Sequence, residues 1–182
     1  MMLHRSNCLG TIVAAVSLLA CSDGRNAVGP KKDLTASDPS YTLGVGSKST
    51  LLGRATFSDP KDQNFKVTRI TDKWHMEIKA KPGFDIAVQT IVFQPGGTSG
   101  WHSHPGPVFI QVQSGTMTFY ESDDPTCSPI VRRAGESYLD AGDHAHITRN
   151  EGTTVAQNLV TYFAPPGAVL RVDADAPTSC PF

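Results

Sequence analysis

The feature that most constrains the fold of this chain is a series of short runs rich in β-branched and aromatic residues, each ended by a turn. The runs follow one another from about Leu51, and Gly, Pro, Asp and Ser clusters separate them. The expected strands are 65–70, 74–80, 85–94, 108–113, 116–121, 137–140, 144–150 and 153–164. No helix of about ten residues is evident. This pattern predicts an all-β domain, in the form of a small double-sheet barrel or jelly roll.

The segment 108–121 carries the clearest strand signal. Val108, Ile110 and Val112 fall on one face of this strand and Gln111 and Gln113 on the other, so one face is expected to lie in the core. A turn at Gly115 is then expected to fold the segment into a β-hairpin.

The first twenty residues differ in kind from the rest. Arg5 precedes an uncharged apolar stretch, residues 9–20, which is too short to span a bilayer and is typical of an export signal. Its end, Leu18-Leu19-Ala20-Cys21, resembles the lipobox of bacterial lipoproteins, where the signal is cut before a cysteine that is lipidated. Cys21 is therefore the expected lipidation site. The alternative is an ordinary secretory signal with an unmodified Cys21.

The chain is predicted to have three parts: a signal peptide (1–20), a lipid-anchored flexible tether (21–50), and a β-barrel domain with a C-terminal tail (51–182). The tether is rich in Gly, Ser, Asp, Lys and Pro and has almost no apolar periodicity. A length of 182 residues suits one core rather than two. This organisation predicts a place in the cell envelope, either lipid-anchored or periplasmic or extracellular, with membrane contact through the lipid only.

Charge and motif content exclude several classes of function. The formal net charge is -1, from 16 basic and 17 acidic residues without a long run of like charge, so no nucleic-acid partner is expected. The sequence also has no paired carboxylates, no nucleophile elbow of a Ser-His-Asp enzyme and no phosphate-binding loop.

The cysteines agree with export. With Cys8 in the signal and Cys21 lipidated, Cys127 and Cys180 remain as a pair. Because the pair is expected outside the cytoplasm, it predicts a disulfide that ties the C-terminal tail to a loop in the middle of the barrel. Two free thiols are the alternative.

Four of the six histidines form two His-x-His pairs, His102 with His104 and His144 with His146. Residues two apart on a strand point the same way, so each pair can direct two imidazoles to one point. Two such pairs on separate strands, each following a turn that contains Gly, predict a metal site.

These pairs lie in segments that resemble the two sequence motifs of the cupin superfamily. The first motif places His-x-His and a Glu between two glycines, and it is matched by Gly96, His102, His104 and Gly115, with Val108 at the Glu position. The second motif is matched by Gly135, His146 and Asn150, with Ala141 and Asp143 where the family has Pro and Gly. The resemblance covers about residues 51–164 and is to small single-domain bacterial cupins. It implies the cupin double-stranded β-helix, a jelly-roll barrel.

The resemblance implies that His102, His104 and His146 hold one divalent metal ion, which is Fe, Zn, Mn, Ni or Cu. It gives His144 no ligand position and leaves it at the pocket rim. Since Val108 cannot bind a metal, three neutral imidazoles would leave the full charge of the ion in place, which favours an anionic ligand. A barrel that has lost its metal and keeps the histidines for packing is the alternative.

Four other residues are candidates for the pocket. Gln89 and Gln157 lie in apolar strands and would orient a substrate, unless alternation turns both to solvent. Trp101 would form a wall of the pocket, unless it only packs in the core. Tyr138 would donate a hydroxyl.

Together these features predict an exported metal-binding cupin that binds or acts on a small anionic or chelating molecule. If it is an enzyme, it is expected to be a metal-dependent dioxygenase-like cupin. The alternatives are a non-catalytic module that binds a small molecule or metal, and a metal-free structural barrel. Cupin barrels often dimerise through exposed strands, so the resemblance also allows a homodimer.

Overall fold

The computed structural model describes residues 44–182 except 60, 62–63, 69–74 and 82, all within the second of two compact units, Ala36–Phe182. The predicted signal, the lipidation site Cys21 and most of the predicted tether lie outside the described residues. In the ranges that the structure describes, no helix has the length and apolar character needed to cross a membrane. The strands are β1 (Val45–Phe57), β2 (Asn64–Thr68), β3 (His75–Lys79), β4 (Phe84–Thr98), β5 (His102–Ser103), β6 (Val108–Ser114), β7 (Thr116–Glu121), β8 (Ile130–Arg133), β9 (Ser137–Asp140), β10 (His146–Arg149), β11 (Ala156–Ala164) and β12 (Val172–Asp173).

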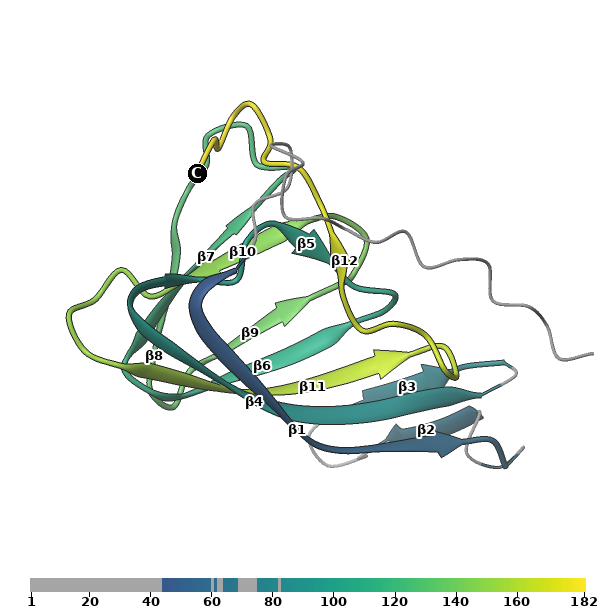
Figure 1. Cartoon of the computed structure of the whole chain (residues 1–182). Helices are drawn as coiled ribbons and strands as arrows, with labels where there is room; N and C mark the ends of the chain where they lie inside the picture. The colour runs from purple at the N-terminus through teal and green to yellow at the C-terminus, as the bar shows by residue number, and fades with distance from the viewer. Residues whose placement is uncertain (1–43, 60, 62–63, 69–74, 82) are drawn as a thin grey trace, which may run out of the picture. The chain divides into compact units, whose positions relative to one another are not determined.

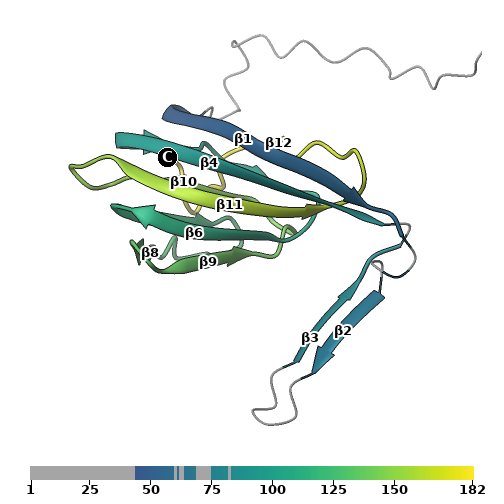
Figure 2. The same ribbon diagram turned by 90° about the horizontal axis from the view of Figure 1, so that it is seen from below.

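Ten of these strands form one hydrogen-bonded sheet that curls into a nearly closed barrel (Figure 1). Strands β1, β4, β11, β6 and β9 lie side by side in one part of it (Figure 2). Strands β8, β7, β10, β5 and β12 follow one another in the other part. The long strand β4 joins the two parts, because its body pairs with β1 and β11 while Thr98 at its end pairs with Arg149 of β10. This architecture confirms the predicted all-β jelly-roll class.

The core lies inside the barrel, where the sequence alternation placed it. Val108, Ile110 and Val112 of β6 are buried, and Phe109, Gln111 and Gln113, which alternate with them, are exposed. Along β11, buried and half-buried positions alternate over the whole strand, and Val160 and Tyr162 point into the same cluster as the β6 residues. Period-two alternation therefore identified the core face of β6 correctly.

The predicted hairpin over residues 108–121 is wrong. Strand β6 pairs with β9 and β11, whereas β7 pairs with β8 and β10, so the two strands do not pair with each other. Gly115, with a φ of 74°, instead turns the chain from one part of the barrel to the other. Alternation shows that a strand has a buried face, but it carries no information about the partner of that strand.

Strands β1, β5, β8 and β12 were not expected. Strand β1 begins at Val45, inside the stretch assigned to the tether, and pairs with β4 from Val45 opposite Thr98 to Phe57 opposite Phe84. Almost all of β1 is exposed on both faces. Such an edge strand is held by backbone hydrogen bonds and needs no apolar alternation, so its sequence resembles a linker.

The C-terminal segment, residues 165–182, folds back onto the barrel. A disulfide joins Cys127 to Cys180, whose Cα atoms are 5.3 Å apart. Next to it, the indole Nε1 of Trp101 donates a hydrogen bond of 2.8 Å to the backbone oxygen of Phe182. Trp101 and Cys180 are fully buried in a small cluster with Tyr120. The segment is thus fixed to the barrel both covalently and by packing.

Candidate metal centre

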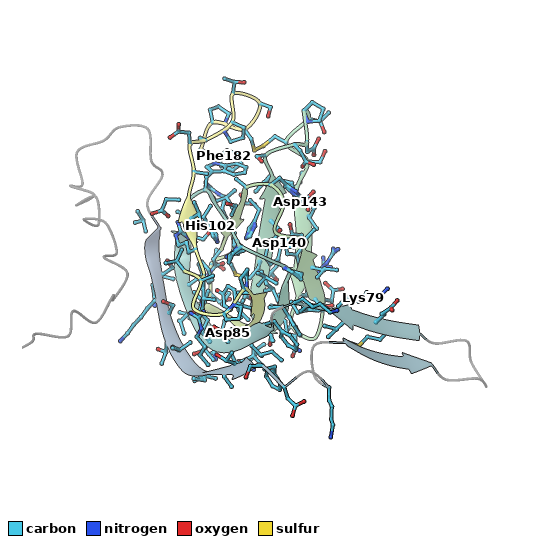
Figure 3. The ribbon with its side chains drawn as sticks, turned by 90° about the vertical axis from the view of Figure 1, so that its right-hand side faces the viewer. Lys79, Asp85, His102, Asp140, Asp143 and Phe182 are labelled. Carbon is cyan, nitrogen blue, oxygen red and sulfur yellow. A yellow bond between two sulfur atoms is a disulfide. The ribbon has the colours of Figure 1, made fainter. Side chains whose placement is uncertain are left out.

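The barrel brings His102, His104 and His146 together in its interior. His102 lies on β5 directly opposite His146, the first residue of β10, and His104 follows two residues later. Their ring centroids are 4.8 Å apart for His102 and His104, 4.5 Å for His102 and His146, and 5.2 Å for His104 and His146. All three are buried, and each offers one ring nitrogen within 4.8 Å of the others. Figure 3 shows His102 among the side chains that fill the barrel.

Backbone carbonyls orient two of the imidazoles. Nδ1 of His102 lies 2.8 Å from the oxygen of Gly100, and Nδ1 of His104 lies 2.5 Å from the oxygen of Leu170. A carbonyl only accepts hydrogen bonds, so in each ring Nδ1 carries the proton. Nε2 of each ring is then the atom with a lone pair, as a metal ligand requires.

The environment keeps these imidazoles neutral. Burial, with the charges of His146 and Arg171 adding to it, lowers the pKa of His102 well below its usual value. Burial and the His146 charge likewise lower the pKa of His104 to about 4. At neutral pH both rings are in the unprotonated form that binds a metal. The donor set therefore fits a divalent ion such as zinc or iron.

Asp140, which sequence reasoning missed, contacts the cluster. Its side chain is buried, its Oδ1 accepts a 2.9 Å hydrogen bond from the amide of Gly142, and its Oδ2 lies 3.2 Å from Nδ1 of His146. The same Oδ2 lies 3.8 Å from Nε2 of His104. Burial raises the pKa of Asp140, but the contacts with His146, Gly142 and His104 outweigh it, so the pKa lies below its usual value. A carboxylate is therefore present beside the three imidazoles.

A cavity of about 510 Å³ opens beside His102 and His104. Arg171 lines it and is held by a 2.6 Å hydrogen bond from its Nε to Oδ1 of Asp173. The other lining residues are Ser47, Ser49, Gln89, Ile91, Phe93, Ser99, Tyr162, Val169 and Leu170. The volume lies in the range of cavities that take small molecules. Arg171 had no signal in the sequence, because it reaches the cavity only through the fold of the C-terminal segment.

Of the other candidate pocket residues, Gln89 lies in this cavity, where its Nε2 donates a hydrogen bond to the hydroxyl of Tyr162. Trp101 does not line it, because the ring is fully buried in the cluster with Cys180. Gln157 is bonded to Gln113 on the outside of the barrel, 2.9 Å from Nε2 to Oε1.

Tyr138 and His144 also lie outside this cavity. Tyr138 packs in the core with its ring centroid 6.1 Å from that of His146, and its hydroxyl donates a 2.8 Å hydrogen bond to Glu121. His144 lies near the surface, where Nδ1 is 2.8 Å from Asp143 and Nε2 is 3.6 Å from Asp123. The structure thus separates His144 from the other three histidines, in agreement with the motif.

Comparisons with known proteins point to one family. Residues 89–162 match the family model of the cupin domain. No curated protein matches the chain. Among solved structures, a double-stranded β-helix protein from Klebsiella pneumoniae subsp. pneumoniae is 20% identical, with 50% of this chain and 75% of that chain covered and a TM-score of 0.43.

Two further structures show the same level of similarity. A cupin domain of an XRE family transcriptional regulator from Enterobacter cloacae is 15% identical, with 67% of this chain and 99% of that chain covered and a TM-score of 0.41. The polyketide cyclase RemF from Streptomyces resistomycificus is 14% identical, with 72% and 75% covered and a TM-score of 0.46. The family match over residues 89–162, the two histidine motifs and the nearly closed barrel agree on a cupin domain in this part of the chain.

Proposed function

We propose that this chain is a metal-binding cupin of the cell envelope, whose three histidines hold one divalent ion next to a site for a small anionic or chelating molecule. The observation that carries the proposal is the burial of three imidazoles with their ligand atoms within 4.8 Å of one another beside a cavity. An ion bound there would act as a Lewis acid toward the molecule in the cavity.

Two features of the cavity support an anionic ligand. Arg171 supplies a fixed positive charge and planar donors that suit a carboxylate. Gln89 and Tyr162 are bonded to each other and offer neutral polar groups nearby. Burial raises the pKa of Tyr162 to about 12, so its hydroxyl stays protonated as a neutral donor. No acidic side chain is among the described residues that line the cavity, although Asp173 pairs with Arg171 and Asp140 lies beside His146.

The composition of the cavity also favours a second candidate, binding without turnover. Apart from the histidines, the titratable side chains among the described lining residues are those of Tyr162 and Arg171, and the raised pKa of Tyr162 keeps its hydroxyl protonated near neutral pH. A ligand would be held there without a general base. The enzyme alternative is a dioxygenase-like cupin in which the ion carries the chemistry. Oxygen uptake by the iron-loaded protein with thiols, diketones and phenols favours the enzyme, and thermal stabilisation by carboxylates without turnover favours binding.

Export belongs to the same proposal. The apolar stretch of residues 9–20 and the lipobox-like end at Cys21 support it from the sequence. The disulfide between Cys127 and Cys180 is consistent with it, because disulfides persist in oxidising compartments. Metabolic labelling with a radioactive fatty acid tests it, and a Cys21→Ala variant that is labelled as strongly as wild type would contradict lipidation.

Metal content tests the core of the proposal. Wild-type protein purified without chelator is expected to carry about one divalent ion per chain, and a His102→Ala/His146→Ala double variant is expected to carry none. His144→Ala is the matched control, because His144 lies outside the cluster, and it should keep the ion. Elemental analysis measures all three proteins. Equal metal content in wild type and in the double variant would overturn the proposed function.

A further inference from the structure

In each of the three imidazoles Nδ1 faces an oxygen atom, but the chemical nature of that oxygen differs in one ring. In His102 and His104, Nδ1 faces a neutral backbone carbonyl. In His146, Nδ1 faces the carboxylate of Asp140 at 3.2 Å. One ring of three is thus held by a charged group, and that group is on a different strand from all the histidines, the end of β9.

The two facing atoms have no regular hydrogen-bond partner among the described residues. Nδ1 of His146 and Oδ2 of Asp140 are both buried and without a hydrogen bond of regular geometry, although they are 3.2 Å apart. Buried polar atoms of this kind are costly unless something completes their environment. An ion on Nε2 of His146 would make Nδ1–H a stronger donor, and the carboxylate is already in place to accept from it.

Asp140 lies close to the position where the first cupin motif has a Glu and this chain has Val108. In the ladder between β6 and β9, Asp140 is directly opposite Val108, which stands at the Glu position of that motif. Side chains of directly opposed residues lie on the same face of a sheet. Both side chains are buried, and Figure 3 shows Asp140 inside the barrel. The neighbouring strand therefore brings a carboxylate to the place where β6 offers a valine.

We propose that Asp140 is the anionic positioning residue of the metal centre, which fixes His146 through Nδ1 and supplies the negative charge that Val108 does not. The inference rests on the proposed function, because it concerns the same site. It also changes the electrostatics expected there, since a buried carboxylate next to three imidazoles offsets one of the two positive charges of the ion.

The effect of removing that charge is testable with Asp140→Asn. Asparagine keeps the shape and an oxygen acceptor but has no charge, so the variant separates electrostatics from packing. We expect Co²⁺ affinity, measured by chelator competition, to fall 10- to 100-fold, as is typical for a partner of a ligating histidine. The absorption bands of bound Co²⁺ should shift as well. Asp143→Asn is the matched control, because Asp143 is exposed and, among the described histidines, its contact is with His144. Its affinity should equal that of wild type.

A measurement on the wild-type protein keeps the inference falsifiable if Asp140→Asn does not fold. In zinc-loaded protein, ¹⁵N-edited NMR of the histidine rings should show zinc on Nε2 of His146 and a strongly downfield proton on Nδ1. A ring that binds zinc through Nδ1, or whose Nδ1 proton is lost to solvent exchange, would overturn the inference.

The outcomes also separate the inference from the proposed function. Wild type that binds neither Co²⁺ nor Zn²⁺ would overturn both. Wild type that binds Co²⁺ with an affinity unchanged in Asp140→Asn would overturn only the role of Asp140. A loss in Asp140→Asn with none in Asp143→Asn supports both.

Discussion

At the scale of single residues, Asp85 shows how one buried carboxylate joins three segments of the barrel. Its oxygens accept hydrogen bonds of 2.6 Å from Nε of Arg54, 2.6 Å from Oγ1 of Thr56 and 2.9 Å from the amide of Gly167. Arg54 and Thr56 belong to the exposed strand β1, and Gly167 belongs to the C-terminal segment. Asp85 therefore anchors two peripheral segments to β4.

These contacts make part of the stability depend on pH. The hydrogen bonds from Thr56 and Gly167 and the charge of Arg54 outweigh burial and lower the pKa of Asp85 below its ordinary value of 3.8. A lowered pKa in the folded state stabilises the protein fully above about pH 4, and this contribution is lost as the pH falls through the folded-state pKa. We expect Asp85→Asn to unfold at a lower urea concentration than wild type at pH 7. The difference between their midpoints should shrink at pH 3, and a constant difference would contradict the assignment.

Asn150, which ends the second histidine motif, ties the turn that follows it to strand β4 through its side chain. It is fully buried, and its Nδ2 donates hydrogen bonds to the backbone oxygens of Phe93, at 3.1 Å, and Thr154, at 2.8 Å. Its Oδ1 accepts from the amide of Gly152 at 3.1 Å. The position is thus explained by structure and needs no role in the chemistry.

Replacing Asn150 with Ala leaves two carbonyls and one amide without these partners. We expect a loss of about 2–4 kcal/mol in the free energy of unfolding, since each lost bond to a buried group costs roughly 1–3 kcal/mol and the effects are not additive. Urea denaturation measures it. Metal content per folded chain should stay as in wild type, and a variant that folds normally but has lost its metal would show that Asn150 acts in the site.

At the scale of elements, Gly115 decides where β6 ends and β7 begins. It has a φ of 74°, and a Cβ added to it would lie 2.7 Å from Cβ and 2.9 Å from Cα of Ala156. The turn thus requires both left-handed backbone and close approach to β11. That combination lets the chain pass from one part of the barrel to the other within a single residue.

Gly115→Ala is therefore expected to destabilise the barrel more than an ordinary glycine replacement does. The loss in the free energy of unfolding should be at least about 2 kcal/mol, from backbone strain together with the clash against β11. Gly135→Ala is the matched control, because Gly135 also has a positive φ, of 89°, but an added Cβ would meet nothing within 4 Å. It should lose about 1 kcal/mol. Equal losses in urea denaturation would show that the close approach to Ala156 does not matter.

The elements also show which parts of the fold the sequence could predict. The alternation in β6 and the β-rich runs correctly located the core face and most strands, because a half-buried strand leaves a period of two. Strand β1 leaves none, since both of its faces are exposed. The partner of β6 was predicted wrongly for another reason. Strand pairing depends on contacts between segments that are distant in the sequence. A glycine such as Gly115 is also compatible both with a hairpin turn and with a passage from one part of the barrel to the other.

At the scale of the whole molecule, the candidate site consists of three histidines that the sequence predicted and two charged residues that it did not predict. His102, His104 and His146 lie in two short motifs, each of which is local in the sequence and could be identified there. Asp140 and Arg171 reach the site only because β9 pairs with β6 and because the C-terminal segment crosses the barrel. Charge at the site is therefore a property of the fold, and the motifs alone implied three neutral ligands.

The C-terminal segment is the part of the molecule that links stability to this site. It carries Leu170, whose oxygen orients His104, and Arg171, which lines the cavity. Its end is held by the disulfide of Cys180 and by Phe182, whose ring lies 4.4 Å from the guanidinium carbon of Arg149. Loosening the end should therefore affect both the barrel and the centre.

A Cys127→Ser/Cys180→Ser double variant tests this link. The disulfide closes a loop with a sequence separation of 53, for which the chain-entropy model gives roughly 4 kcal/mol, so the variant should lose up to that amount of unfolding free energy. Its Co²⁺ affinity should fall as well, because the carbonyl that orients His104 is less firmly placed. Wild type in excess reductant is the control and should match the variant in both measurements. If the variant lost stability but kept its full Co²⁺ affinity, the C-terminal segment would hold the barrel closed without organising the histidines.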